Sequence, residues 1–150
     1  MKNLILTSIF IISTLFSIAQ EKISFATFNF KIMDVTKNPK VNLETIYKVG
    51  PSGKIDHWDG FNHYEVDLKK MVLIHSYVGE ETGNGEKNKI LNFKKTKDFY
   101  SFDAKDSECG KISYFIPRDK KSKYKLLIKY KSGKNTEVAF FDSSSFIIPL

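Results

Sequence analysis

The sequence predicts an all-β domain, an antiparallel sandwich of about seven to ten strands, with a small β-barrel as the alternative. Strand-sized apolar runs recur along the chain, separated by turn residues at intervals of roughly eight to twelve positions. Within several runs apolar and polar residues alternate, which places the apolar side chains on one face of a strand. No window offers three helical turns of apolar residues with caps, so no long helix is expected.

The clearest strand pair is a hairpin over residues 123–142. The apolar side chains that alternate along its first strand are Tyr124, Leu126, Ile128 and Tyr130. The turn falls at 132–135, and Val138 and Phe140 share a face of the returning strand. Two strands alone are only marginally stable, so the rest of the chain should supply the sheet beneath them.

The remaining strands are expected in chain order between turn signals. They are predicted at 22–33, 41–49, 54–58, 64–68, 71–78, 90–93, 98–102, 111–116 and 146–150. The first needs a bulge near Ala26-Thr27 if its apolar side chains are to share one face. The run at 71–78 is almost continuously apolar, which predicts a strand covered on both faces. Residues 79–88 and 103–110 are expected to be exposed loops.

Residues 1–19 are predicted to be a secretory signal peptide and residues 20–150 a single mature domain. Lys2 gives a positive start, an apolar run follows, and Ser17-Ile18-Ala19 fits a cleavage site. The run is short for a membrane span, and an uncleaved anchor is the alternative. Gln20 follows the predicted cut where a lipid anchor would need cysteine. We therefore expect an exported protein, periplasmic or extracellular, with no stable membrane insertion after cleavage.

The chain is basic, with 24 Lys and Arg against 17 Asp and Glu and a formal net charge of +7. Only Arg118 is an arginine, and bidentate reading of phosphates or guanine favours arginine over lysine. Specific nucleic-acid binding is therefore not expected. The lysines proposed as a binding face are Lys123, Lys125, Lys129 and Lys131. They could dock an anionic glycan, lipid or protein, or simply protect an edge strand from aggregation.

Cys109 is the only cysteine, so an intramolecular disulfide is impossible although export implies an oxidising compartment. Pairing with another chain and simple burial both stay open. Its acidic neighbours Asp106 and Glu108 would raise a thiol pKa, which argues against a reactive nucleophile. The apolar core must therefore hold the fold, and 13 phenylalanines are available for it.

The densest polar cluster lies at residues 56–63. Its candidate metal ligands are Asp56, His57, Asp59 and His63. Their spacing matches no zinc signature, and a further ligand such as His75 would be needed, so we expect no metal and no cofactor. The aromatic residues of the same segment are Trp58, Phe61 and Tyr64. They could form a patch that stacks on a sugar ring or anchors a partner, or they could pack into the core.

Turn and strand features follow one another in a recognisable order over residues 30–90. They are Phe30-Lys31-Ile32, the Asp34-to-Pro39 turn, the alternating 41–49 segment, Asp59-Gly60, Tyr64-Glu65-Val66 and the strand at 73–79. This order resembles the carboxypeptidase regulatory-like domain, a transthyretin-like β-sandwich. The family's Gly-Ala after the proline turn is absent at Val41-Asn42, and residues after about 94 have no counterpart. The resemblance implies a non-catalytic structural or adaptor module and carries over no active-site residue.

A second resemblance lies in Ile116-Pro117 followed by the alternating strand from Tyr124. A tyrosine in this position is similar to the tyrosine corner of immunoglobulin-like sandwiches. Both resemblances imply the same architecture, immunoglobulin-like or transthyretin-like.

The leading functional expectation is an exported, non-enzymatic binding or adaptor protein whose partner is a protein or a glycan. One alternative is a carrier of a small apolar ligand, with a barrel cavity lined by Phe28, Phe30 and Tyr77. Another is a hydrolase built on one of the three histidines, although no Gly-x-Ser-x-Gly motif accompanies them.

Overall fold

The computed structural model describes residues 22–27, 30–58, 62–77, 85–107, 109–142 and 146–147, most of them in strands. The predicted signal peptide at 1–19 and the predicted turn at Asp59-Gly60 lie outside these residues. Side chains are described for the same residues, apart from Trp58, Tyr77, Phe146 and Ile147.

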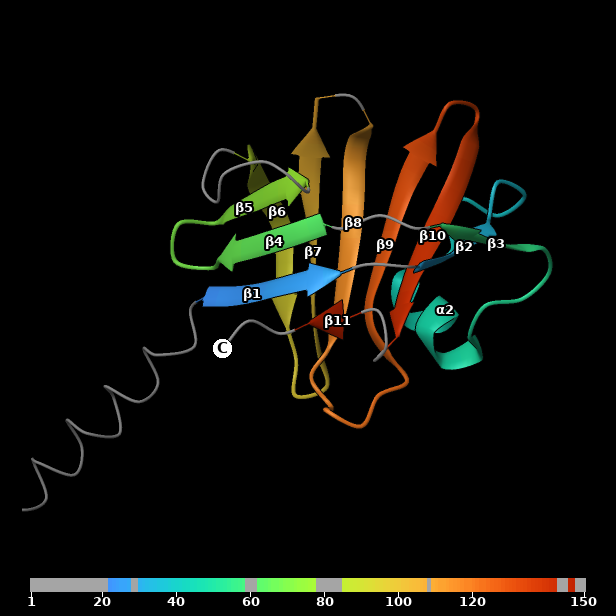
Figure 1. Cartoon of the computed structure of the whole chain (residues 1–150), viewed down its shortest axis with the longest axis horizontal. Coiled ribbons are helices and arrows are strands. Elements are labelled where there is room, and N and C mark those ends of the chain that lie inside the picture. The colour runs from blue at the N-terminus through green and yellow to red at the C-terminus, as the bar shows by residue number, and fades with distance from the viewer. Residues whose placement is uncertain are drawn as a thin grey trace, which may run out of the picture.

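Eleven strands and one short helix make up the described part of the chain (Figure 1). The strands are β1 (Lys22–Thr27), β2 (Phe30–Asp34), β3 (Ile55–Trp58), β4 (Asn62–Asp67), β5 (Val72–Tyr77), β6 (Glu86–Lys95), β7 (Phe99–Asp106), β8 (Gly110–Pro117), β9 (Tyr124–Ser132), β10 (Asn135–Asp142) and β11 (Phe146–Ile147). They form one antiparallel sheet, in the order β11-β1-β4-β5-β6-β7-β8-β9-β10-β2-β3, which curls into a half-barrel. The antiparallel all-β prediction is confirmed, but the strands form one curled sheet where a sandwich of two sheets was predicted.

Three pairs of consecutive strands continue one another across the curl. β1 pairs with β4, and β2 pairs with β3. The register is almost the same in the two pairs: Thr27 is opposite Asn62 at the end of the first, and Phe30 is opposite Trp58 at the start of the second. β11 and β10 pair in the same way with β1 and β2. The strand predicted at 22–33 is therefore two strands, on opposite sides of the curl. Because only two or three residues separate the members of each pair, the two ends of the sheet lie close together.

The concave, inner face of the sheet is filled with aromatic rings. Phe25 and Tyr64 come from β1 and β4, and their ring centroids lie 5.0 Å apart. Tyr114 of β8 lies 6.3 Å from Tyr64 and 4.9 Å from Phe102 of β7. Figure 1 shows β1 and β4 crossing steeply in front of the long strands that carry these last two rings. The inner core therefore ties both halves of the curled sheet together.

The outer face of β7–β10 forms a second core with the helix α2 (Leu43–Val49). Leu43 and Ile46 of α2 are buried against the outward-facing Phe115, Leu127 and Phe140. Since α2 has only seven residues, the described part of the chain contains no helix that could cross a membrane.

The prediction of a strand at 41–49 is wrong, because most of this segment forms the helix α2. Asn42 caps its start by accepting a 2.8 Å hydrogen bond from the Thr45 amide, and Gly50 ends it with φ 79°. The alternating pattern is real, but Leu43 and Ile46 also have helical spacing, and the outer face of the sheet covers that stripe. Tertiary burial therefore decides between two local patterns that the sequence supports about equally.

The predicted hairpin at 123–142 is confirmed as β9 and β10, with a bulge near Phe141 and Asp142. The bulge turns Tyr124 to the outer core, whereas Leu126 and Ile128 face the inner core as predicted. Each face of the hairpin therefore contributes side chains to a core, whereas the sequence predicted apolar side chains on one face of its first strand.

Three further predictions need correction. The run at 71–78 forms β5, but only its inner side is deeply covered: Leu73 is fully buried, while Val72 and Ile74 are partly exposed. The loop predicted at 79–88 gives way to β6 from Glu86 onward. β7 extends to Asp106 into the loop predicted at 103–110, because pairing with β8 continues along its whole length.

Candidate functional site

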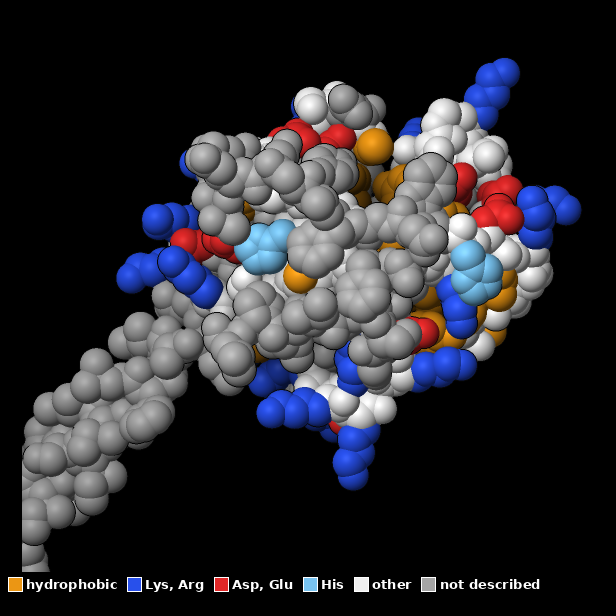
Figure 2. Space-filling view, in the orientation of Figure 1, with side chains coloured by type: hydrophobic (Ala, Val, Ile, Leu, Met, Phe, Trp, Pro, Cys, Tyr) orange, Lys and Arg blue, Asp and Glu red, His pale blue; other side chains and the backbone are white. Residues whose placement is uncertain are grey.

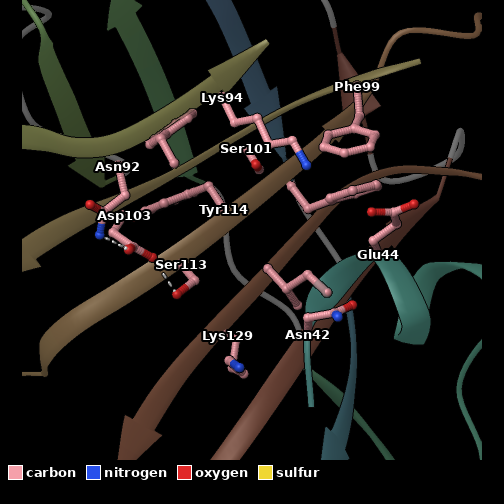
Figure 3. Close-up of a pocket in the computed structure, with 13 residues that line it drawn as sticks. Asn42, Glu44, Asn92, Lys94, Phe99, Ser101, Asp103, Ser113, Tyr114 and Lys129 are labelled. Atoms are coloured by element: carbon pink, nitrogen blue, oxygen red, sulfur yellow. Dashed lines mark hydrogen bonds between the residues drawn. The ribbon is translucent and has the colours of Figure 1, made fainter. Parts of the chain in front are cut away.

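A groove runs along α2 on the outer face of the sheet (Figure 3). It consists of two adjoining pockets, of about 300 and about 510 Å³, that share Glu44, Phe99 and Phe115. Its position follows from the composition of the outer face. The helix covers the apolar part of β7–β9 and leaves the neighbouring polar part open.

Asp103 organises the polar end of the groove. Asn92 Nδ2 donates to Asp103 Oδ2 at 2.7 Å, and Ser113 Oγ donates to Oδ1 at 2.7 Å, as Figure 3 shows. Lys111 Nζ lies 2.9 Å from Oδ2, and only 14% of the Asp103 side chain is exposed. Burial raises the pKa of Asp103, but the hydrogen bonds from these three donors outweigh it and hold the pKa below its ordinary value.

Asn92 reaches Asp103 from an irregular point in β6. Its φ is 51°, in the left-handed region, and the register with β7 shifts between Leu91 and Lys94. Asparagine tolerates this conformation better than most residues, and such strained positions often occur at ligand sites. The sequence signal was weak: one polar residue inside a strand-sized apolar run.

Lys129 closes the same end from β9. Its Nζ donates to the Val41 carbonyl at 2.6 Å and lies 3.4 Å from the Pro39 carbonyl. Burial, and next the charge of Lys111, lower the pKa of Lys129, while Asp103 opposes them. Lys129 therefore fastens the segment before α2 to the sheet.

Aromatic rings form the floor of the groove. The centroids of Phe99 and Phe115 lie 4.7 Å apart, and Tyr47 of α2 lies 5.3 Å from Phe115. Lys94 Nζ lies 5.4 Å from the Phe99 centroid, and Figure 3 shows it reaching over that ring. The charged residues that line the larger pocket are Lys48, Lys97, Arg118, Glu44, Asp98 and Asp119. Cations and anions are therefore balanced around an apolar floor.

The other lysines of the predicted binding face do not join Lys129 at the groove. Lys123 Nζ lies 5.3 Å from the Tyr124 ring centroid, Lys125 Nζ bonds the Lys120 carbonyl, and Lys131 is exposed near the opposite end of β9. Of these four lysines, Lys129 alone lines the groove, and their role as a binding face stays a prediction.

The predicted aromatic patch loses one member to the core. Tyr64 is only 4% exposed and stacks on His75 with 4.5 Å between ring centroids. Trp58 pairs through its backbone with Phe30. The Trp58 side chain, Phe61 and Asp59 lie outside the described residues.

The three histidines do not converge: His63 and His75 lie on the paired strands β4 and β5 but point to opposite faces of the sheet, and His57 lies on β3. His57 is exposed on β3 beside Asp56, whose carboxylate lies 3.4 Å from Lys54 Nζ. His75 faces inward, with Nε2 2.9 Å from the Asn62 side-chain oxygen. Among the described residues, no three His, Cys, Asp or Glu side chains converge as a metal site would require.

His63 lies on the outer face of β4 between two polar groups. Its Nε2 is 3.1 Å from Ser24 Oγ, and its Nδ1 is 4.0 Å from Glu65 Oε1. Ser24 and Glu65 also line a hollow of about 290 Å³. The order serine, histidine, carboxylate resembles that of an activated nucleophile, but 4.0 Å is too long for a hydrogen bond from the imidazole to Glu65. Sequence reasoning missed it because Ser24 comes from a different strand.

Comparisons with protein families, with curated proteins and with solved structures find no match to this chain. The resemblance to carboxypeptidase regulatory-like domains therefore stays a prediction. One of the features that carries it, the alternating segment at 41–49, contains the helix α2.

Proposed function

We propose that this protein is an exported, non-catalytic binding protein that holds a segment of a partner protein in the groove beside α2. The observation that supports this most directly is the groove itself: an open, two-chambered site with an aromatic floor and polar groups at fixed positions. Its volume lies in the range of about 300–1,000 Å³ that is typical of ligand sites.

The lining favours a peptide over an ion or a purely apolar molecule. Phe99 and Phe115 offer contact to one apolar side chain, and the balanced charges of the rim suit flanking residues of either sign. Asp103 and Asn92 fix polar groups at one end, where they limit how a ligand can be oriented.

The apolar-carrier alternative has less support. A carrier would hold its ligand on the concave side of the sheet, where Phe102, Tyr114 and Phe141 pack tightly. For the fold, the paired strands and the closeness of the two sheet ends favour a barrel-like arrangement over an immunoglobulin-like or transthyretin-like sandwich.

Filling the groove should test the proposal without disturbing either core. Ser101 is a half-buried outward-facing residue of β7 that lines the smaller pocket, so Ser101→Trp should block it. Ser132→Trp, at the exposed end of β9, is the matched control. We expect a random peptide library displayed on phage to yield binders to the wild type and to Ser132→Trp, with at least tenfold weaker binding to Ser101→Trp. Equal binding to all three proteins, or no enrichment, would remove this function.

A second candidate, hydrolysis of an ester, is supported by the contact between Ser24 and His63. Ser24 Oγ would attack the carbonyl carbon and pass its proton to His63 Nε2, and the imidazolium would return that proton to the departing alcohol. Water, deprotonated by His63, would then cleave the acyl-Ser24 ester, which releases the acid and restores Ser24. The test is p-nitrophenyl acetate hydrolysis by the wild type, Ser24→Ala and His63→Ala, with His57→Ala as the control. A rate that depends on Ser24 and His63 but not on His57 would favour the enzyme. Equal rates would exclude it.

A further inference from the structure

Two loops form one end of the long strands. Residues 96–98 connect β6 to β7, and residues 118–123 connect β8 to β9. The Arg118 amide donates to the Asp98 carbonyl at 2.8 Å, and the Arg118 guanidinium donates to the Thr96 carbonyl at 2.7 Å. Figure 1 shows both loops at the lower end of the molecule. They therefore form one joined surface, which we call the basic end.

The basic end carries most of the net charge of the protein. Its cations are Lys94, Lys95, Lys97, Arg118, Lys120, Lys121, Lys123 and Lys125, against the acids Asp98 and Asp119. Eight cations less two acids give +6 of the formal +7 of the whole chain. Figure 2 shows Lys and Arg side chains projecting from this lower end. The rest of the molecule is close to neutral.

The opposite end of the same strands is a natural comparison. Among the described residues of 103–113 and 131–137 the cations are Lys105, Lys111, Lys131 and Lys134, and the acids are Asp103, Asp106 and Glu137. The net charge of these residues, four cations less three acids, is +1, against +6 at the basic end. The charge is therefore polarised along the strands, which a uniform solubilising coat of lysines would not produce.

The cations of the basic end are available to a partner. All are exposed except Lys125, which is half-buried and donates to the Lys120 carbonyl. Lys94, Lys95, Arg118 and Lys123 also lie over aromatic rings, but these contacts leave their charges unneutralised. The ion pairs in the described part of the chain involve Lys48, Lys54, His63 and Lys111, and none of them involves a cation of the basic end. Protection of an edge strand does not account for them, because β7, β8 and β9 are interior strands of the sheet.

We propose that the basic end docks the protein on the surface of an anionic lipid bilayer. Lysine is a compact, hydrated point charge without the planar fork that a shaped anion site uses, so it suits a diffuse surface of charge. A flat surface can meet both loop tips at once. Each lysine close to an anionic membrane strengthens binding about fivefold, an effect that decays over about 8–10 Å. The basic end adjoins the groove, since Lys94, Lys97, Arg118, Asp98 and Asp119 also line it, but membrane docking does not depend on the groove function.

The test is sedimentation of the full mature chain with vesicles of phosphatidylglycerol and phosphatidylcholine, or of phosphatidylcholine alone. The variant Lys120→Glu/Lys121→Glu/Lys123→Glu changes the basic end without touching residues that line the groove. The variant Lys105→Glu/Lys131→Glu/Lys134→Glu makes the same charge change at the opposite end, and all six lysines are exposed.

At about 50 mM salt we expect the wild type to bind the anionic vesicles only, and the basic-end variant to bind at least about a hundredfold more weakly. The opposite-end variant should lose less than tenfold. Raising the salt to about 500 mM should release the wild type. Equal losses in both variants would show that only net charge matters and would overturn the proposal. So would binding to heparin beads without binding to vesicles, which would identify an acidic polysaccharide as the partner.

Discussion

The two faces of β7–β10 use the same strands for different purposes. The inner face buries Tyr114 and Phe102 against rings from β1 and β4, and its packing is continuous from one half of the sheet to the other. The outer face buries Phe115 and Leu127 under α2 but leaves Asp103 and its donors beside an open groove.

The difference lies in what covers each face. A sheet that curls onto itself covers a long area, so its inner positions can be apolar throughout. A helix of seven residues covers only part of the opposite face, so the rest must be polar or form a site. The inner face therefore supplies stability, and the outer face is where binding chemistry can lie.

Phe141→Ala in the inner core should have the largest effect, and it tests whether the inner face of the sheet supplies most of the stability. Phe141 is 2% exposed, and its ring centroid lies 4.9 Å from that of Phe30, near the point where the chain crosses the curl. We expect a loss of about 4 kcal/mol in the free energy of unfolding, measured by urea denaturation. Leu91→Ala, at an exposed position, is the control and should change the free energy by less than about 1 kcal/mol.

Ile46→Ala tests the covered part of the outer face. Ile46 is 4% exposed, and it is one of two fully covered side chains through which α2 holds the sheet. We expect a smaller loss, about 3 kcal/mol, because the short helix can shift to fill part of the cavity. A loss larger than that of Phe141→Ala would show that the outer core, rather than the inner, dominates stability.

Asp103→Asn tests the open part of the outer face. The amide keeps the shape but accepts weaker hydrogen bonds from Asn92, Ser113 and Lys111, so we expect a loss of about 1–2 kcal/mol at pH 7. The folded pKa of Asp103 lies below its ordinary value. Its stabilisation is therefore complete above about pH 4 and is lost as the pH falls through the folded pKa. Urea midpoints from pH 7 to 2 should fall less steeply in the variant, and parallel curves would contradict this account.

Asn42→Ala should give the smallest effect. It removes the cap at the start of α2, where the Asn42 side chain accepts from the Thr45 amide, and should lower stability by about 1 kcal/mol. Asn42→Asp, which keeps the acceptor, should restore most of it. If neither change alters the urea midpoint, packing alone fixes α2 on the sheet.

Local sequence patterns predicted where strands lie more reliably than they predicted which other elements pack against those strands. The hairpin of β9 and β10 was predictable because Leu126 and Ile128 alternate with polar neighbours and a glycine turn follows. At 41–49 the same kind of alternation led to a wrong prediction of a strand, because Leu43 and Ile46 also have the i, i+3 spacing of a helix. The site residues Asn92 and Asp103 gave little signal, since nothing local showed that β6 and β7 would bring them within 2.7 Å.

The sequence by itself determined the antiparallel β class, most strand positions and the basic character of the chain. These properties depend on side-chain alternation and turn residues, which act over a few positions. The tertiary structure alone decided that α2 is a helix, that the two loops of the basic end adjoin, and that Ser24 faces His63. Each of these depends on which distant surfaces are buried together, and that free energy is shared over the whole sheet rather than stored in any one segment.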